Sequence, residues 1–235
     1  MRVLLTGGSG LLGTHIKLEL ERLSIDYYSP ESSECDITSL PNVMKTIANY
    51  KPTIVIHCAA VAKYKIVEQE PMKAIQANIV GTCNIVTACE KQSHDIKLVY
   101  ISTDHVFDGQ DGDYEINDKI NPLSKYAKTK AAGELAVRIY KNHLSIRTSF
   151  CPKEFPFDTA YTDKWTSQDY VDLISPKIVE VALGEKTGIC NVGHKRRSFY
   201  ELAYVRNKNI KKGSVAEIVA KSKVPILIDT SLKIN

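Results

Sequence analysis

The 235-residue sequence predicts an α/β protein built on a doubly wound parallel sheet, with a small C-terminal lobe. Short apolar runs alternate along the chain with longer stretches in which apolar residues recur at helical spacing. The first apolar run ends in a glycine-rich turn that leads directly into a helical pattern. Strands that alternate with helices indicate a parallel sheet covered on both faces, and a chain of this length can bury one sizeable core.

The expected elements follow one another in a regular order. Strands are expected at residues 2–6, 26–28, 53–58, 97–102, 144–148 and 188–192. Helices are expected at residues 11–23, 41–50, 71–92, 126–140, 167–183 and 198–206. Helical periodicity places four apolar residues of the fourth helix on one face: Ala127, Ala131, Leu135 and Ile139.

The composition excludes two classes of partner. The chain has 43% hydrophobic and 25% charged residues, and it has no apolar run close to the roughly twenty residues that a membrane span needs. The formal net charge of +4 is mild. The densest basic stretch, residues 206–212, lacks the interleaved aromatic residues of a nucleic-acid surface. We therefore expect neither a membrane nor a nucleic acid as partner.

The N-terminus and the cysteines bear on the compartment. Residues 1–6 enter a strand pattern directly, without the basic segment and apolar core of a secretory leader, so we expect a cytoplasmic protein. The six cysteines show no C-x-x-C pair and no metal-ligand spacing. We expect them to be reduced thiols in the core, and we expect no metal site.

The turn from Thr6 to Gly13 has the pattern of a dinucleotide-binding turn. In such a turn Gly7 permits the tight bend, Gly10 lets the backbone approach a pyrophosphate, and Gly13 allows close helix packing. The free N–H groups of the following helix would bind the phosphates. An ordinary glycine-rich turn is the alternative. The residues of the turn expected to contact the cofactor are Gly7, Ser9, Gly10, Leu11 and Leu12.

The chain is expected to consist of two parts. Residues 1–150 are expected to form an NAD(P)-binding Rossmann domain, and residues 151–235 a small substrate-binding lobe interleaved with it. In doubly wound sheets, ligands bind beyond the carboxyl ends of the strands. The loosely patterned sequence after residue 150 is therefore where substrate contacts are expected.

Tyr126 and Lys130 lie four residues apart on an expected helix, so they share one face. A fixed cation beside a phenol favours the phenolate, and we expect Lys130 to lower the pKa of Tyr126 toward the range used in proton transfer. Thr103, at the end of the expected strand 97–102, is the candidate to hold a substrate carbonyl oxygen. A Tyr–Lys pair at this spacing also occurs by chance on many helices.

Several motifs together resemble the extended short-chain dehydrogenase/reductases, and within them the dTDP-4-dehydrorhamnose reductase family. They are the turn Thr6–Gly13, the segment Ser102–Gly109, the pair Tyr126 and Lys130 followed by Ala132-Gly133-Glu134, and Arg147-Thr148-Ser149. Smaller matching pieces extend the resemblance over nearly the whole chain.

The resemblance implies roles for individual residues. Tyr126 would donate a proton to a keto oxygen as a hydride arrives from the nicotinamide, Lys130 would also bind the nicotinamide ribose, and Thr103 would orient the carbonyl. The other residues implied in the cofactor site are Asp36 and Ile37 against the adenine, Cys58, Ala59 and Ala60 along the cofactor, and Asn78 in support of the active site. Asn78 fits equally well as a residue that ties backbone groups together.

The sequence leaves the choice of cofactor open between NADP and NAD, with NADPH favoured. A carboxylate at the end of the second strand usually marks NAD, and a nearby Arg marks NADP. Here the strand 26–28 is followed by Ser29-Pro30-Glu31-Ser32-Ser33, which shows neither signature clearly. The serines can contact a 2′-phosphate, but Ser and Pro are also ordinary turn formers.

The sequence departs from the family pattern where the substrate is recognised. His105 stands where the family has Tyr, Phe150 stands where it has Trp, and the C-terminal lobe is several tens of residues shorter. The expected substrate-binding residues are Thr103, Asp104, His105, Phe150, Lys164 and Trp165, with Tyr161 and Arg147 as further candidates. His105 could add acid–base chemistry, such as epimerisation, or simply pack. Trp165 could equally pack the lobe onto the main domain.

Three functions follow from these features. The first is NAD(P)H-dependent reduction of a nucleotide-linked 4-keto-6-deoxy sugar, with the nucleotide sugar as partner and a homodimer as one possible assembly. The second is a non-catalytic, NADP-binding regulatory subunit of another enzyme, suggested by the shortened lobe. The third is a sugar-nucleotide epimerase or reductase of the same fold. The complete set Thr103, Tyr126 and Lys130 favours an enzyme, because a pure binding module needs no such set.

Overall fold

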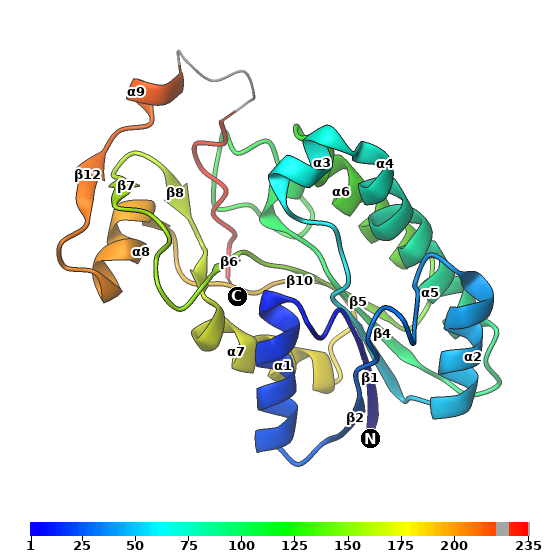
Figure 1. Cartoon of the computed structure of the whole chain (residues 1–235). Helices are drawn as coiled ribbons and strands as arrows, with labels where there is room; N and C mark the ends of the chain where they lie inside the picture. The colour runs from blue at the N-terminus through cyan, green and yellow to red at the C-terminus, as the bar shows by residue number, and fades with distance from the viewer. Residues whose placement is uncertain (220–225, 235) are drawn as a thin grey trace.

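The computed structural model describes residues 1–219 and 226–234. A six-stranded parallel sheet forms its centre, in the order β10-β5-β4-β3-β1-β2 (Figure 1). The strands of this sheet are β1 (Arg2–Thr6), β2 (Asp26–Tyr28), β3 (Ile54–His57), β4 (Lys97–Ile101), β5 (His143–Arg147) and β10 (Gly188–Asn191). Because all pairs are parallel, the carboxyl ends of the strands lie along one edge, as the sequence predicts.

Helices cover both faces of the sheet. On one face α1 (Leu11–Arg22) packs against α7 (Val171–Leu183). On the other face lie α2 (Leu40–Tyr50), α5 (Thr82–Glu90) and α6 (Lys125–Val137). Each face has its own apolar core: Leu12, Ile16 and Leu20 of α1 contribute to one, and Val43 and Ile47 of α2 to the other. The doubly wound architecture expected from the sequence is therefore confirmed.

The expected long helix at 71–92 is interrupted. It consists of α4 (Pro71–Ala74), a π-helix η1 (Ile75–Gly81) and α5, and a separate helix α3 (Tyr64–Gln69) precedes it. A π-helix carries one extra residue per turn and often occurs at functional sites. Its buried residues here are Asn78 and Gly81.

The four apolar residues expected on one face of α6 differ in their burial. Ala127 and Ala131 are buried, but Leu135 is 49% exposed, and Ile139 lies beyond the end of the helix and is 84% exposed. The helix is turned so that Gly133 lies against η1 and β4, where an added Cβ would come within 2.7 Å of the Asn78 carbonyl oxygen. This rotation buries polar residues of the helix in place of the expected leucine.

The chain after residue 150 builds small pairs of strands beside the main sheet, at the left of Figure 1. The additional elements are β6 (Phe150–Cys151), β7 (Thr159–Tyr161), β8 (Trp165–Thr166), β9 (Asp169–Tyr170), β11 (Arg197–Ser198), α8 (Phe199–Arg206), β12 (Lys211–Gly213) and α9 (Ala216–Val219). Because β8 and β9 form here, α7 begins at Val171 and not at Ser167. We call the described residues of 150–234 outside α7 and β10 the lobe.

The lobe and the main sheet share the chain. After β9 the chain returns to the sheet as α7 and β10 before it enters the lobe again, and the segment 226–234 then runs back along the loop before α6. Tyr114 N donates to Ser231 O at 2.9 Å, and Asn191 Nδ2 donates to Tyr114 O at 2.9 Å. The expected lobe boundary at residue 151 stays a prediction, and residues 220–225 and 235 lie outside the described part.

Three expectations about the surface and the cysteines can be compared with the described residues. None of their helices has the length and apolar character needed to span a bilayer. Residues 1–219 and 226–234 hold no cluster of His, Cys, Asp and Glu arranged to bind a metal ion. All six cysteines are unpaired, but Cys83 is exposed on α5 and so does not belong to the core as expected.

Candidate active site

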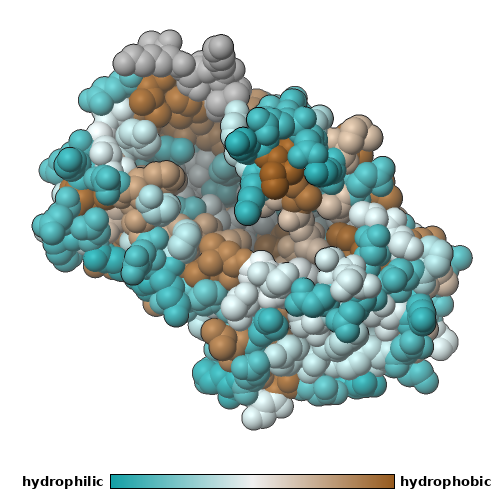
Figure 2. Space-filling view, in the orientation of Figure 1, coloured by the Kyte–Doolittle hydropathy of each residue, from teal (hydrophilic) through white to brown (hydrophobic). Residues whose placement is uncertain are grey.

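A cavity of about 380 Å³ lies beyond the carboxyl ends of β1, β3, β4 and β5. Figure 2 shows the surface hollowed between the lobe and the helices α3 and α4. Five segments that are far apart in the sequence supply most of the cavity lining: the glycine turn, the residues after β3, those after β4, those after β5, and the start of α6. The expected site residues that line it are Gly7, Gly10, Leu11, Leu12, Cys58, Ala60, Thr103, Asp104, His105, Phe150, Tyr126 and Lys130.

The glycine turn is shaped by close contacts of backbone. Gly7 has φ +75°, and a Cβ at this position would lie 2.5 Å from the backbone nitrogen of Ala59. A Cβ on Gly13 would lie 2.2 Å from the Gly7 carbonyl oxygen. Gly10, which begins α1, provides no side-chain cap, so the first N–H groups of the helix remain available to an anion. The turn therefore has the geometry of a phosphate site.

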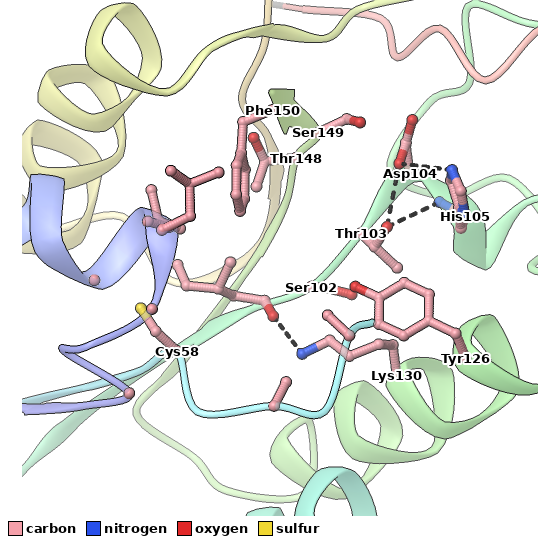
Figure 3. Close-up of a pocket in the computed structure, with 18 of the residues that line it drawn as sticks. Cys58, Ser102, Thr103, Asp104, His105, Tyr126, Lys130, Thr148, Ser149 and Phe150 are labelled. Atoms are coloured by element: carbon pink, nitrogen blue, oxygen red, sulfur yellow. Dashed lines mark hydrogen bonds and ion pairs between the residues drawn. The ribbon is translucent and has the colours of Figure 1, made fainter. Parts of the chain in front are cut away.

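Lys130 lies deep in the cavity wall. Its ammonium donates a hydrogen bond to the carbonyl oxygen of Ile101 at 2.7 Å and lies 4.1 Å from the centre of the Tyr100 ring (Figure 3). Burial lowers the pKa of Lys130 to about 8, although Cys58 and Glu134 act in the opposite direction. The ammonium is thus held by the end of β4, within reach of the cavity.

Tyr126 does not have the lowered pKa expected from its neighbour. Burial, together with the negative charge of Asp104, raises the pKa of Tyr126 to about 12, and the Thr103 hydroxyl acts in the opposite direction. The expectation of a lowered pKa is therefore wrong for this state of the protein, because desolvation outweighs the cation one turn away. The phenol stays protonated at neutral pH, which is the form that can donate a proton.

Thr103, Asp104 and His105 form a compact group after β4. The Thr103 hydroxyl donates to Asp104 Oδ1 at 3.1 Å and accepts from the backbone N–H of His105 at 3.2 Å. The His105 ring meets the Tyr126 ring edge-on, with centroids 6.3 Å apart. Since Thr103 has one hydroxyl hydrogen, it must release Asp104 before it can donate to a substrate carbonyl.

Several expected cofactor residues lie outside the cavity lining. The Asp36 carboxylate accepts from the backbone and hydroxyl of Thr38, at 2.9 and 2.8 Å, and Ile37 packs against Gly81. Ser9 is exposed, and Ala59 contacts the turn through its backbone. Their contact with a cofactor stays a prediction.

Asn78 is 1% exposed and ties backbone groups together. Its amide oxygen accepts from Val61 N at 2.7 Å, and its amide nitrogen donates to Val61 O at 3.0 Å and to Thr129 Oγ1 at 2.9 Å. It thus holds the segment after β3 against α6. Both roles weighed for Asn78 are compatible with this position, because the segment it holds borders the cavity.

The expected substrate residues of the lobe separate into two groups. Lys164 and Tyr161 line a second hollow of about 560 Å³. Trp165 lies under the Arg196 guanidinium, 4.0 Å from its ring centre, and its backbone pairs with residues 228 and 230. Trp165 therefore packs within the lobe, against Arg196 and the segment 226–234, and its expected role in substrate binding stays a prediction.

Arg147 is not available to a substrate. It is 1% exposed and forms an ion pair with Glu134 at 2.7 Å, so its placement among the substrate candidates is wrong. Sequence reasoning also missed two residues. Thr148, which lines the cavity, is 2% exposed, and its hydroxyl has no hydrogen-bond partner among the described residues. His57, directly before Cys58, is fully buried behind the glycine turn.

The parallel sheet, the glycine turn after its first strand and the Tyr–Lys pair together have the pattern of the short-chain dehydrogenase class. The chain belongs to the family of the RmlD substrate binding domain, whose model matches residues 1–156.

Known proteins similar to this chain support that assignment. A dTDP-4-dehydrorhamnose reductase of Mycolicibacterium smegmatis is 37% identical over 138 residues, which cover 58% of this chain and 41% of the relative. The methionine adenosyltransferase 2 subunit beta of Bos taurus is 34% identical over 143 residues, 58% of this chain and 42% of the relative. The chain thus spans about half the length, or less, of the curated relatives it matches.

The solved structures extend the likeness to the whole fold. The dTDP-4-dehydrorhamnose reductase of Bacillus anthracis, solved in complex with NADP, superposes with a TM-score of 0.85 at 26% identity, covering 100% of this chain and 89% of that one. A hypothetical dTDP-4-dehydrorhamnose reductase of Sulfolobus tokodaii gives a TM-score of 0.84 at 29% identity, covering 99% and 92%. The sequence-based resemblance to this family is confirmed.

Proposed function

We propose that the protein is an NAD(P)H-dependent reductase of the keto group of a nucleotide-linked 4-keto-6-deoxy sugar. One observation carries the proposal: Tyr126, Lys130 and Thr103 lie in the same cavity as the glycine turn. A proton donor and a dinucleotide site within one cavity are the two requirements for delivering a proton and a hydride to the same carbonyl. The names of the reductase relatives support the substrate class.

The residues of the site fit a nicotinamide dinucleotide. The N–H groups at the start of α1 would hold the pyrophosphate, and the residues after β3, including Cys58 and Ala60, would border the molecule. The Lys130 ammonium is placed to bind the nicotinamide ribose. When bound, the reduced cofactor supplies the hydride. The NADP complex of the Bacillus anthracis relative favours NADP for this chain.

The side chains of the cavity supply the proton and hold the carbonyl. Tyr126 donates its hydroxyl proton to the keto oxygen as the carbonyl carbon accepts a hydride, so the product is an alcohol. The phenolate left on Tyr126 is stabilised by the positive charge of Lys130. Thr103, once its hydroxyl turns from Asp104, donates a second hydrogen bond to the same oxygen.

The second hollow fits the nucleotide half of the substrate. Phe155, Phe157 and Phe199 offer aromatic rings to a nucleobase, and Phe157 is 66% exposed. The Lys164 ammonium lies 4.8 Å from the centre of the Phe199 ring. Burial lowers the pKa of Lys164, and the negative charge of Asp104 partly opposes this shift. We assign Lys164 to a substrate phosphate, between the base and the sugar.

The test is turnover on defined substrates. The purified protein is incubated with NADPH or NADH and a panel of dTDP- and UDP-linked 4-keto-6-deoxy sugars, and absorbance of the reduced cofactor is followed. Substrate-dependent oxidation is expected, faster for one nucleotide than for the other. Tight binding of cofactor without oxidation across the panel would contradict the reductase.

A regulatory subunit is the second candidate, and the likeness to the methionine adenosyltransferase 2 subunit beta of Bos taurus favours it. Under this alternative the chain binds NADP and acts through a partner enzyme. The discriminating result is a stable complex with such an enzyme, together with no oxidation of NADPH or NADH by any keto sugar. The buried, positioned Lys130 argues for catalysis, because a buried ammonium costs stability that a binding module need not bear.

A further inference from the structure

His57 is a buried histidine behind the cofactor turn. It is the last residue of β3 and is 0% exposed. Its Nδ1 lies 2.7 Å from Thr6 Oγ1, at the end of β1, and its Nε2 lies 3.0 Å from Thr82 Oγ1, at the start of α5. One ring thus connects the residue before Gly7 to the helix that follows η1.

The hydrogen-bond partners of His57 determine the tautomer of its ring. Thr82 donates its only hydroxyl hydrogen to the Asn78 carbonyl oxygen at 2.8 Å, so it must accept from His57 Nε2–H. The ring is neutral, because burial and the nearby Lys130 charge lower the pKa of His57 to about 3. Nδ1 therefore has no hydrogen and accepts from the Thr6 hydroxyl. A neutral imidazole has one donor and one acceptor nitrogen, so it can bind the Thr6 hydroxyl and the Thr82 oxygen at the same time.

The connection continues to the catalytic helix. Asn78 donates through its amide nitrogen to Thr129 Oγ1 at 2.9 Å, and Thr129 donates to the Tyr126 carbonyl oxygen at 2.8 Å. All the side chains that make these bonds are at least nine-tenths buried. A continuous buried chain of hydrogen bonds therefore joins the phosphate turn, through His57, to the backbone of Tyr126.

We propose that His57 is a positioning residue that sets the phosphate turn against the catalytic helix, so that a bound dinucleotide meets Tyr126 and Lys130 in register. The inference rests on the proposed dinucleotide site and adds to it the group that aligns its two halves. His57 is not itself part of the cavity lining. Its effect passes through Thr6 on one side and through Thr82 and Asn78 on the other.

The first experiment compares His57→Phe with the unchanged protein by titrating each with NADPH and following cofactor fluorescence. Phe keeps a planar ring and removes both hydrogen bonds, so we expect the dissociation constant to rise about tenfold, and kcat at saturating cofactor and sugar to fall by a similar factor. A role in folding alone would lower Tm and leave both values within about twofold. That result would overturn the proposal.

Two further variants make the test specific. Thr6→Val removes the donor that His57 accepts from, and the double variant Thr6→Val with His57→Phe should bind NADPH no more weakly than the worse single variant, because both remove the same link. Fully additive losses would contradict a shared path. His94→Phe is the matched control, because His94 binds the carbonyl of Pro52 at 3.1 Å, near the opposite end of β3. We expect it to leave the NADPH dissociation constant unchanged.

A measurement on the unchanged protein covers the case in which His57→Phe fails to fold. Nitrogen-15 NMR of labelled histidine at pH 5 should show that the His57 ring stays neutral and carries its hydrogen on Nε2 only, and the opposite tautomer would contradict the arrangement. His57→Asn, which keeps an acceptor facing Thr6, should recover NADPH affinity better than His57→Phe. Cofactor binding without turnover would refute the proposed reductase but not the role of His57, since the titrations need no turnover.

Discussion

Glu134 of α6 and Arg147 of β5 form an ion pair at 2.7 Å in which neither side chain is more than 1% exposed. Ser102 donates a further hydrogen bond to Glu134 at 2.6 Å, and Arg147 donates to the carbonyl of Ile116 at 3.0 Å. The pair therefore joins α6 to β5, to the residue after β4 and to the loop before α6. Buried charges of this kind are tolerated only while both partners remain.

We expect Arg147→Met to destabilise the protein by about 3–5 kcal/mol, because it leaves the Glu134 carboxylate buried without its partner. Urea unfolding followed by circular dichroism measures the change. Replacing both residues by Met should recover a large part of the loss, since no unpaired charge then remains. The exposed Arg138→Met serves as control. A loss below about 1 kcal/mol for Arg147→Met would contradict the claim that the buried Glu134 carboxylate depends on Arg147 for its stability.

The buried ammonium of Lys130 is expected to lower the free energy of unfolding. Its pKa is about 8 in the folded chain and 10.5 in a solvated one, so the folded state disfavours the ammonium. The cost is fully present below about pH 8 and is relieved as the pH rises from 8 toward 10.5. Lys130→Met should thus be more stable than the unchanged protein at pH 7, by about 2 kcal/mol after loss of the Ile101 hydrogen bond.

Unfolding curves of both proteins at pH 7 and pH 10 test this prediction, and the stability gap should narrow at the higher pH. Lys128→Met, on the exposed side of the same helix, should show no such dependence. A Lys130→Met protein that is less stable at pH 7, with a gap independent of pH, would show that the ammonium is not disfavoured by burial.

The cofactor preference is expected to depend on Lys17. A Cβ placed on Gly8 would lie 1.9 Å from Ser29 Oγ and 3.5 Å from Lys17 Cδ, so both side chains converge on the turn. The cation of Lys17, on α1, and the hydroxyl of Ser29, directly after β2, suit the 2′-phosphate of NADP. Lys17→Met should raise the KM for NADPH about tenfold and leave that for NADH nearly unchanged. Equal changes in both KM values would remove Lys17 from this role, and Lys45→Met on α2 is the control.

His105 is expected to pack and not to transfer a proton in the reduction. Its ring lies edge-on to Tyr126, and 43% of its side chain is exposed. His105→Phe should therefore keep more than one tenth of kcat, since loss of a general acid or base costs about 10²–10⁴-fold. Solvent deuterium incorporated beside the keto group by the unchanged protein, but not by His105→Phe, would instead reveal epimerase chemistry.

The sequence predicts the parts of the site that depend on backbone pattern. Gly7, Gly10 and the Tyr126–Lys130 pair could be located because a tight turn and a four-residue spacing impose geometry on whatever sequence carries them. The structure places them in one cavity. The parallel sheet follows similarly from the alternation of strands and helices, whereas the order of its strands comes from the structure.

Side-chain direction and partner choice could not be read in the same way. Arg147 follows the expected strand pattern, but only the packed structure shows that it faces Glu134 and not the cavity. Trp165 was ambiguous because an aromatic residue serves equally in packing and in recognition, and only the structure shows that Arg196 lies above its ring. The pKa of Tyr126 likewise depends on burial, which spacing alone does not contain.

The most direct test of the account is Tyr126→Phe, assayed for NADPH oxidation with the best keto-sugar substrate and titrated with NADPH alone. The change keeps the ring and removes the proton, so turnover should fall at least about 100-fold while the dissociation constant of NADPH stays within about threefold. Turnover close to that of the unchanged protein would contradict the claim that Tyr126 is the proton donor, and with it the catalytic site proposed for this chain.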